Sequence, residues 1–302
     1  MKTTCSMTSQ LLVSVLEDGK TYREVGNEHG LVHSTVERRI KGLLRRIVRQ
    51  GRVPGFDEAW IDSLAQMRKH RTELLSAVEG QQEPSAKRQF DLMNAEQIAA
   101  GASRLRERSA SANRDVALLY ALFSTGLKTI ELARLEVRDY IDEDGRVRVR
   151  SCLRAEAAVN GQSRPLLFNS ARAVEHIDAY LVERLRRKLG MGQAGRYRGL
   201  DPTSRLFLTE AGKPYLVTHR SPTDSRPSCK YLQATLRQVF ARAGWGGMTA
   251  HHARRHVAVC LDRQGADEEQ MQELLGLKLT KSVRRLMAGA RAPLEVVSRE
   301  LV

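Results

Sequence analysis

The sequence predicts a mainly α protein with a small antiparallel β-sheet, arranged in two domains. The chain has 302 residues, which is long enough for two cores of ordinary domain size. Apolar residues recur at helical spacing in several segments, whereas only two short segments, 146–150 and 164–168, alternate as strands do. The polar stretch 81–92, which contains Pro84, has no apolar period and is the predicted linker between domains 1–80 and 93–302.

The charge of the chain indicates the kind of partner. Fifty Lys and Arg residues against 35 Asp and Glu give a net charge of +15. Such an excess favours a polyanionic partner, most directly double-stranded DNA, although a basic surface with no ligand is the plain alternative. Because no apolar run approaches the length of a membrane span and the start lacks a signal-peptide core, we expect no membrane association and a cytoplasmic location, in the bacterial cytosol or nucleoid.

The cysteines argue against a metal or disulfide framework. Cys5, Cys152, Cys229 and Cys260 are scattered and form no Cys-x-x-Cys pair. Neither a zinc site nor a set of disulfides is therefore expected, and nothing in the sequence calls for a cofactor.

The first domain has the outline of a helix-turn-helix. A helix after Lys20, a tight turn at Gly30 and a second helix would account for residues 20–44, and Ser34 with Glu37 three residues later predicts a capping box at the start of the second helix. A further helix is predicted over 57–78. The alternative is a small helical bundle whose basic face is only solvated.

The second helix of this outline supplies the candidate DNA contacts. Its opposite face is basic, with Glu37 as the only acid in the helix. In helix-turn-helix proteins, residues near the start of the second helix reach base edges and basic residues further along hold phosphates. The candidates for the start are His33, Ser34, Thr35, Arg38 and Arg39, and those further along are Lys41, Arg45, Arg46 and Arg49.

The second domain is predicted to be helical around its two strands. Asn94 can cap a helix, and apolar residues predict helices over 115–123, through Val174 to Leu189 and through Leu232 to Phe240. A further candidate helix runs from about His251 to Arg263. Gly145 lies in the turn before the first strand. If the last of these segments is a helix, His251 and Arg254 lie one turn apart on one face, where they can clamp a phosphate.

Several ordered motifs in this domain resemble those of tyrosine recombinases of the phage integrase family. Thr125-Gly-Leu-Lys-Thr-Ile-Glu-Leu132 resembles the first signature box, and 248–277 resembles the second and third boxes without gaps. The resemblance implies the fold of the recombinase catalytic domain over roughly 90–302. It places His251 and Arg254 at the catalytic histidine and second arginine, Lys128 at the first arginine, and Glu131 at an acidic residue that braces the region.

The resemblance fails at the residues that would complete catalysis. Leu277 stands where the family has histidine or tryptophan, Leu286 stands at the nucleophilic tyrosine, and no tyrosine follows Tyr231. No lysine lies between Gly145 and Phe168, where the family has its catalytic lysine. Arg154 is the nearest cation, but a guanidinium is a poor proton donor because its pKa exceeds about 12. Ser282 is near the nucleophile position but has no adjacent activating base.

These departures predict a catalytically inactive DNA-binding protein that regulates transcription or assists an active recombinase. One alternative is a working recombinase whose nucleophile is supplied in trans, and another is a non-specific nucleoid binder. The remaining Lys128, His251 and Arg254 are either structural relics or still grip one phosphate, and we expect Arg254 to be an exposed pocket residue. The segment 292–302 is a candidate for docking on the same subunit or on a neighbouring copy of the chain, and the second arrangement would give a homo-oligomer.

Overall fold

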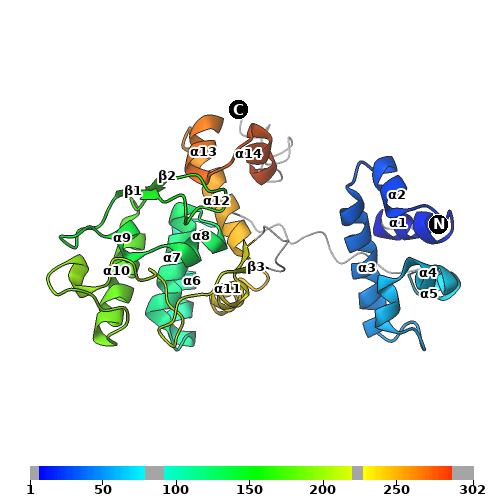
Figure 1. Cartoon of the computed structure of the whole chain (residues 1–302), viewed down its shortest axis with the longest axis horizontal. Helices are drawn as coiled ribbons and strands as arrows, with labels where there is room; N and C mark the ends of the chain where they lie inside the picture. Colours follow the sequence, from blue (N-terminus) through cyan, green and yellow to red (C-terminus); the bar gives the residue numbers. More distant parts are fainter. Residues whose placement is uncertain (1–6, 79–91, 220–226, 288–302) are drawn as a thin grey trace. The chain divides into compact units, whose positions relative to one another are not determined.

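The computed structural model describes residues 7–78, 92–219 and 227–287, which fall into two compact units, 1–89 and 90–302 (Figure 1). Each unit has its own apolar core. The predicted linker 81–92, apart from residue 92, lies outside the described residues, as do Cys5 and the segment 292–302.

The N-terminal unit is entirely helical over its described residues. Its elements are α1 (Met7–Leu16), α2 (Tyr22–Glu28), α3 (His33–Arg49), the 3-10 helix η1 (Glu58–Asp62), α4 (Leu64–Lys69) and α5 (Arg71–Val78). The single helix predicted over 57–78 is wrong, because this segment forms three pieces. Ser63 is extended and its hydroxyl accepts a hydrogen bond from the Gln66 amide, so it ends η1 and caps α4.

The corner between α2 and α3 is tight. Gly30 has a φ of 62°, and a Cβ on Gly26 would lie 2.6 Å from the Leu31 carbonyl oxygen, so the backbone of the turn packs directly on α2. The predicted capping box at Ser34 is wrong. The N-cap of helix α3 lies two residues earlier, at Val32. The Val32 carbonyl accepts from the Thr35 amide, and its side chain forms no cap.

The capping box of this corner lies instead at the start of α2. The Thr21 hydroxyl accepts from the Glu24 amide, and the Glu24 carboxylate accepts from the Thr21 amide at 2.7 Å. Helix α3 is then held by its buried face, which consists of Val36, Ile40, Leu43, Leu44 and Ile47.

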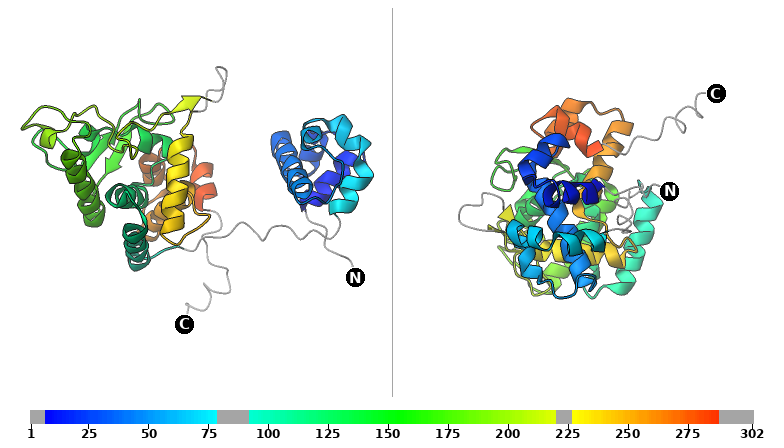
Figure 2. Two further views of the ribbon diagram at one scale, coloured as in Figure 1. Left: turned by 90° about the horizontal axis from the view of Figure 1, so that it is seen from below. Right: turned by 90° about the vertical axis from the view of Figure 1, so that its right-hand side faces the viewer.

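In the C-terminal unit, α7 (Ala112–Thr125) runs through the core. It packs against α6 (Ala95–Arg108), α10 (Ala171–Arg186), α11 (Lys230–Arg242) and α12 (Ala250–Arg263), and α11 lies at the surface of the unit in Figure 2. The remaining helices are α8 (Thr129–Arg134), α9 (Val137–Tyr140), the 3-10 helix η2 (Tyr197–Gly199), α13 (Glu268–Leu275) and α14 (Thr280–Met287). Asn94 caps α6 as the sequence predicts.

Two short antiparallel strand pairs complete this unit. Strand β1 (Arg150–Leu153) pairs with β2 (Arg164–Leu167), with Leu153 opposite Arg164, and β3 (Thr218–His219) pairs with β4 (Pro227–Ser228). The predicted small antiparallel sheet is therefore confirmed, but its first strand begins at Arg150 rather than spanning 146–150. The preceding residues fold back on α9 instead, where the Arg148 amide donates to the Tyr140 carbonyl at 2.8 Å.

The described residues contain no group of three or more His, Cys, Asp or Glu side chains that could hold a metal ion. Cys152, Cys229 and Cys260 are free thiols. None of the helices in the described parts of the chain has the length and apolar character needed to cross a membrane.

Candidate functional site

A buried carboxylate, Glu131, organises the region of the recombinase-like motifs. Helix α7 ends at Gly126, whose φ of 62° is left-handed, and Lys128 becomes the N-cap of α8. This places Glu131 three residues into α8, where its carboxylate accepts from the Lys128 amide at 2.9 Å. The side chain is 0% exposed, so its charge must be matched inside the protein.

Arg164 from β2 provides the main counter-charge. Its guanidinium donates two hydrogen bonds to Glu131, at 3.0 and 2.7 Å, and a third to the Leu274 carbonyl at 3.1 Å. Burial would raise the pKa of Glu131, but the hydrogen bonds and charge of Arg164 outweigh burial and leave the pKa lowered. Glu131 is therefore ionised at neutral pH. Sequence analysis identified Arg164 only as the first residue of a strand and missed this role.

Arg254 from α12 is buried beside this pair, which corrects the expectation of an exposed pocket arginine. Only 5% of it is exposed. Its guanidinium donates to the Gly126 carbonyl at 2.7 Å and to the Leu275 carbonyl, so it ties the end of α7 to the end of α13. Burial lowers the pKa of Arg254 to about 10 although Glu131 opposes this, and the group stays charged at neutral pH.

Lys128 and His251 are the more accessible members of the predicted pocket. The Lys128 ammonium lies 3.9 Å from the Glu131 carboxylate, and its pKa is lowered by burial against the pull of Glu131. His251 is exposed in the first turn of α12, with its ring centroid 6.3 Å from that of His252. The structure thus brings Lys128, Arg164 and Arg254 around Glu131, an arrangement with more positive than negative charge.

Arg154 belongs to a different cluster, contrary to its predicted place in the pocket. Its guanidinium donates to Asp139 at 2.7 Å and lies 3.0 Å from a carboxylate oxygen of Glu136. The hydrogen bond to Asp139 raises the pKa of Arg154, so it is even less able to act as a proton donor. Its role in the structure is to hold α9 against the end of β1.

Leu286, at the predicted nucleophile position, is part of an apolar cluster with Val257, Ala258 and Leu275. Only 7% of Leu286 is exposed, and Leu277 is half-buried against the same cluster. The side chain at position 286 therefore packs α14 against α12 and α13. Ser282 lies one turn earlier in α14, where its amide donates to the Leu279 carbonyl.

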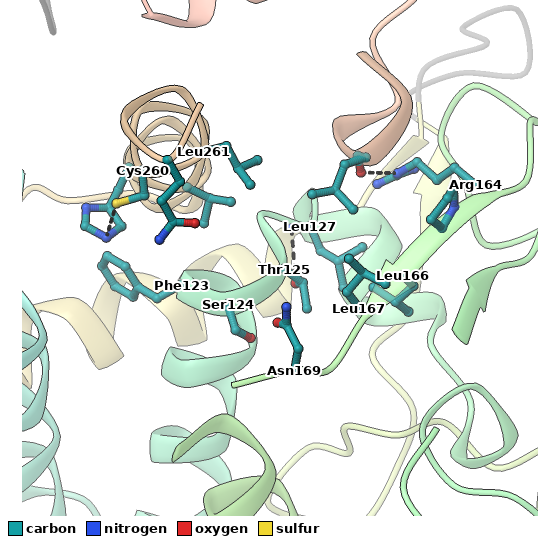
Figure 3. A pocket seen from close by; sticks show the side chains of 15 residues that line it. Phe123, Ser124, Thr125, Leu127, Arg164, Leu166, Leu167, Asn169, Cys260 and Leu261 are labelled. Carbon is teal, nitrogen blue, oxygen red and sulfur yellow. Dashed lines mark hydrogen bonds between the residues drawn. The ribbon is translucent and has the colours of Figure 1, made fainter. Parts of the chain in front are cut away.

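A pocket of about 180 Å³ lies beside this region, between the end of α7, strand β2 and α12 (Figure 3). Most of its wall is apolar, with Phe123, Leu127, Leu166 and Leu261 contributing. The Cys260 thiol at one side is 3.4 Å from His256, and burial raises its pKa, so this thiol is protonated at neutral pH. This largely apolar lining resembles a gap in the hydrophobic core more than a binding site for a charged ligand.

The basic face of α3 in the N-terminal unit is partly neutralised. Sequence analysis found Glu37 as its only acid, but η1 brings two more carboxylates to this face. Arg45 donates to Asp62 at 3.0 Å, and Arg49 lies 2.6 Å from Glu58.

Lys41 is engaged in the same way, at 2.8 Å from Glu37 and 3.0 Å from Asp62. His33, Ser34 and Arg38 are exposed, whereas Thr35, Arg39 and Arg46 are half-buried. No acidic partner of Arg38 or Arg46 is found within the described residues of this unit.

The mainly helical C-terminal unit with its small antiparallel sheet has the fold of a tyrosine-recombinase catalytic domain. Residues 90–288 match the phage integrase family, and the chain belongs to that family.

Curated relatives include two proteins named tyrosine recombinase XerC. That of Roseiflexus castenholzii is 28% identical and that of Roseiflexus sp. strain RS-1 is 30% identical, each over 172 residues. The matched part is 57% of this chain and 46% of each relative, so the chain spans about half the length of these curated proteins.

Similar solved structures are also recombinases. The XerA recombinase superposes with a TM-score of 0.48 at 14% identity, covering 98% of this chain and 97% of that one. A λ integrase (75–356) dimer bound to a COC′ core site gives a TM-score of 0.42 at 14% identity, covering 85% of this chain and 82% of that one.

Proposed function

We propose that this chain is a DNA-binding member of the phage integrase family that does not break or join DNA. The observation that carries the proposal is Leu286, an apolar side chain buried in a helix–helix cluster at the position where the family places its nucleophile. Covalent catalysis on a phosphodiester requires a nucleophile, and the leucine at position 286 carries no nucleophilic group.

The cations of the site support the same proposal. The Arg254 guanidinium donates hydrogen bonds to backbone carbonyls, and that of Arg164 donates to a carbonyl and to Glu131. A phosphate that entered this region would meet Lys128 as the partly exposed cation, and a single ammonium cannot make the two-pronged contact of a guanidinium. The Lys128 ammonium can attract a DNA phosphate, but it would hold the phosphate less firmly than the family's complete set of catalytic residues would.

The N-terminal unit is proposed to act as the sequence reader. Its α2–turn–α3 corner has the helix-turn-helix outline, and the exposed His33, Ser34 and Arg38 lie at the start of α3, where such proteins contact base edges. The biological role that fits a reader joined to a non-cutting recombinase domain is regulation of transcription or assistance to an active recombinase. Such a protein would work in the cytoplasm or nucleoid, on double-stranded DNA.

A suicide DNA substrate, in which a nick prevents religation, tests the absence of cleavage. Purified full-length protein should form no covalent protein–DNA adduct with substrates that carry its preferred binding sequence. Leu286→Tyr should also form none, because Leu277 and the missing lysine remain. An adduct formed by the unaltered protein would show an active enzyme and overturn the proposal, and mapping the linked residue would identify its nucleophile.

A further inference from the structure

Val32 presents an apolar side chain to solvent at the beginning of α3. It is 65% exposed, whereas its neighbour Leu31 packs against the core of the unit. His33 and Ser34, the next two residues, are also exposed. Val32 therefore lies at the end of α3 that the proposed function assigns to base contacts.

The requirements of folding do not account for a valine at this position. Val32 is the N-cap of α3, a 17-residue helix, and forms no side-chain cap. The N-caps of α2, η1 and α4, which are Thr21, Asp57 and Ser63, each accept a backbone hydrogen bond. Valine is among the poorest N-cap residues, and serine or aspartate there would stabilise the helix. A local preference that is broken without a compensating contact is expected at functional sites.

The surroundings of Val32 favour DNA as the partner that covers it. The exposed Arg38 lies one and a half turns further along α3, and the half-buried Arg46 follows on the same helix, both without an acidic partner in the described part of the unit. A small apolar contact with cations further along the same helix fits a polyanion with an apolar group among its base edges. In the major groove that group is the thymine 5-methyl, which no other standard base carries.

We infer that Val32 packs against the 5-methyl group of a thymine and contributes sequence preference at that base pair. The inference rests on the proposed role of α3 as the DNA reader and adds the chemical feature that it reads. Burying one methyl group changes affinity by about fourfold, so the preference of Val32 for thymine over a base without the methyl should be of that size.

The experiment uses full-length protein and the DNA duplex that it enriches most strongly from a random-sequence library. Each thymine of that duplex is replaced in turn by deoxyuridine, which removes only the 5-methyl group. Deoxyuridine at one position should weaken binding of the unaltered protein about fourfold. Val32→Ala should bind the original duplex more weakly and should no longer distinguish thymine from deoxyuridine there.

Two further variants separate readout from folding. Val32→Ser should lose the thymine preference while keeping a folded N-terminal unit, because serine restores the missing cap. Val182→Ala makes the same truncation at a 54% exposed valine of α10 and should leave both affinity and thymine preference unchanged.

The outcomes distinguish this inference from the proposed function. If no sequence is enriched, the sequence-reading role of α3 and the inference both fail. If a sequence is enriched but contains no thymine whose methyl matters, or if Val32→Ala and Val32→Ser keep the full response to deoxyuridine, the role of Val32 is wrong while the reader remains. A valine covered by a protein partner instead of DNA would give this second pattern.

Discussion

Arg254 in α12 and Arg38 in α3 are both arginines on helices that the sequence predicts to contact DNA, yet the structure surrounds them differently. Arg254 is buried and its guanidinium is occupied by the Gly126 and Leu275 carbonyls. Arg38 is exposed on a helix that packs through its opposite face. Removing the first should be felt in the stability of the fold, and removing the second should be felt in DNA binding.

The same contrast separates the carboxylates that pair with arginines. Glu131 is fully buried between Arg164 and Lys128, whereas Glu58 pairs with Arg49 at the surface. A buried pair that loses one partner leaves a charge without compensation, but an exposed pair is replaced by water at little cost. The burial of an ion pair, more than the residue types that form it, therefore decides how much the pair contributes to the free energy of unfolding.

The largest effect is expected from Glu131→Gln. This change keeps the shape of the side chain but leaves Arg164 without its counter-charge, which should lower the free energy of unfolding by about 3–5 kcal/mol. Chemical denaturation of the full-length protein measures the loss in the C-terminal unit. The matched control is Glu58→Gln, which should cost far less because water replaces its exposed pair with Arg49. Equal losses in the two variants would remove the distinction between the regions.

Arg254→Ala should destabilise the C-terminal unit by about 2–4 kcal/mol, because the Gly126 and Leu275 carbonyls lose a buried donor. An exposed pocket arginine, as the sequence led us to expect, would have been lost with little effect on the fold. The readout is the denaturation midpoint, together with DNA affinity of the fraction that remains folded. A stable Arg254→Ala protein with weakened DNA binding would instead give Arg254 the phosphate-contacting role.

Leu286→Ala should cost about 2–4 kcal/mol, since it opens a cavity in the small cluster that holds α14. Ser282→Ala, at a half-buried position of the same helix, is the control and should change the free energy of unfolding by about 0.5 kcal/mol or less. Thermal denaturation distinguishes the two. If Leu286→Ala were as harmless as the control, position 286 would be free of the packing role that we assign to it.

Arg38→Ala should affect DNA binding, whereas Arg254→Ala should affect the stability of the fold. Folding stability should change by about 0.5 kcal/mol or less, while binding to the preferred DNA sequence should weaken by about 1–3 kcal/mol if the guanidinium contacts a base edge. Thr35→Ala should do the same. Titrations of preferred and scrambled duplexes show whether the loss is confined to the preferred sequence. A uniform loss on both would make Arg38 a phosphate contact.

The smallest effects are expected at Arg45 and Arg49 of the same helix, because their guanidinium groups already pair with Asp62 and Glu58. Arg46, which has no such partner within the described residues, should contact a phosphate more readily. Arg46→Ala should reduce the slope of log affinity against log salt by about one, and Arg49→Ala should reduce it by less. The order of these two slopes is the measurement, and a reversed order would mean that the ion pairs with η1 open when DNA binds.

The sequence determined the fold class and most of the helices, because both depend on local patterns. Apolar residues predicted α7, α10 and α11 close to their observed bounds, the candidate helix 251–263 is observed as α12, and Asn94 was correctly identified as a cap. The motif spacing also led to the recombinase domain. Local patterns failed at two places. The turn before α3 puts the N-cap at Val32 instead of Ser34. Most of the predicted strand 146–150 folds back on α9 instead of pairing with β2.

Only the tertiary structure decided what the charged residues of the site do. The hydrogen-bonded partners are far apart in the sequence. Arg254 and Gly126 are separated by 128 residues and Glu131 and Arg164 by 33. Arg45 and Asp62 are separated by 17. No sequence period links such partners, and whether a guanidinium faces a carbonyl, a carboxylate or water depends on which helix ends and strands the fold brings together. The sequence supplied the cations, and burial and hydrogen bonding assigned Arg254 and Arg164 to the core.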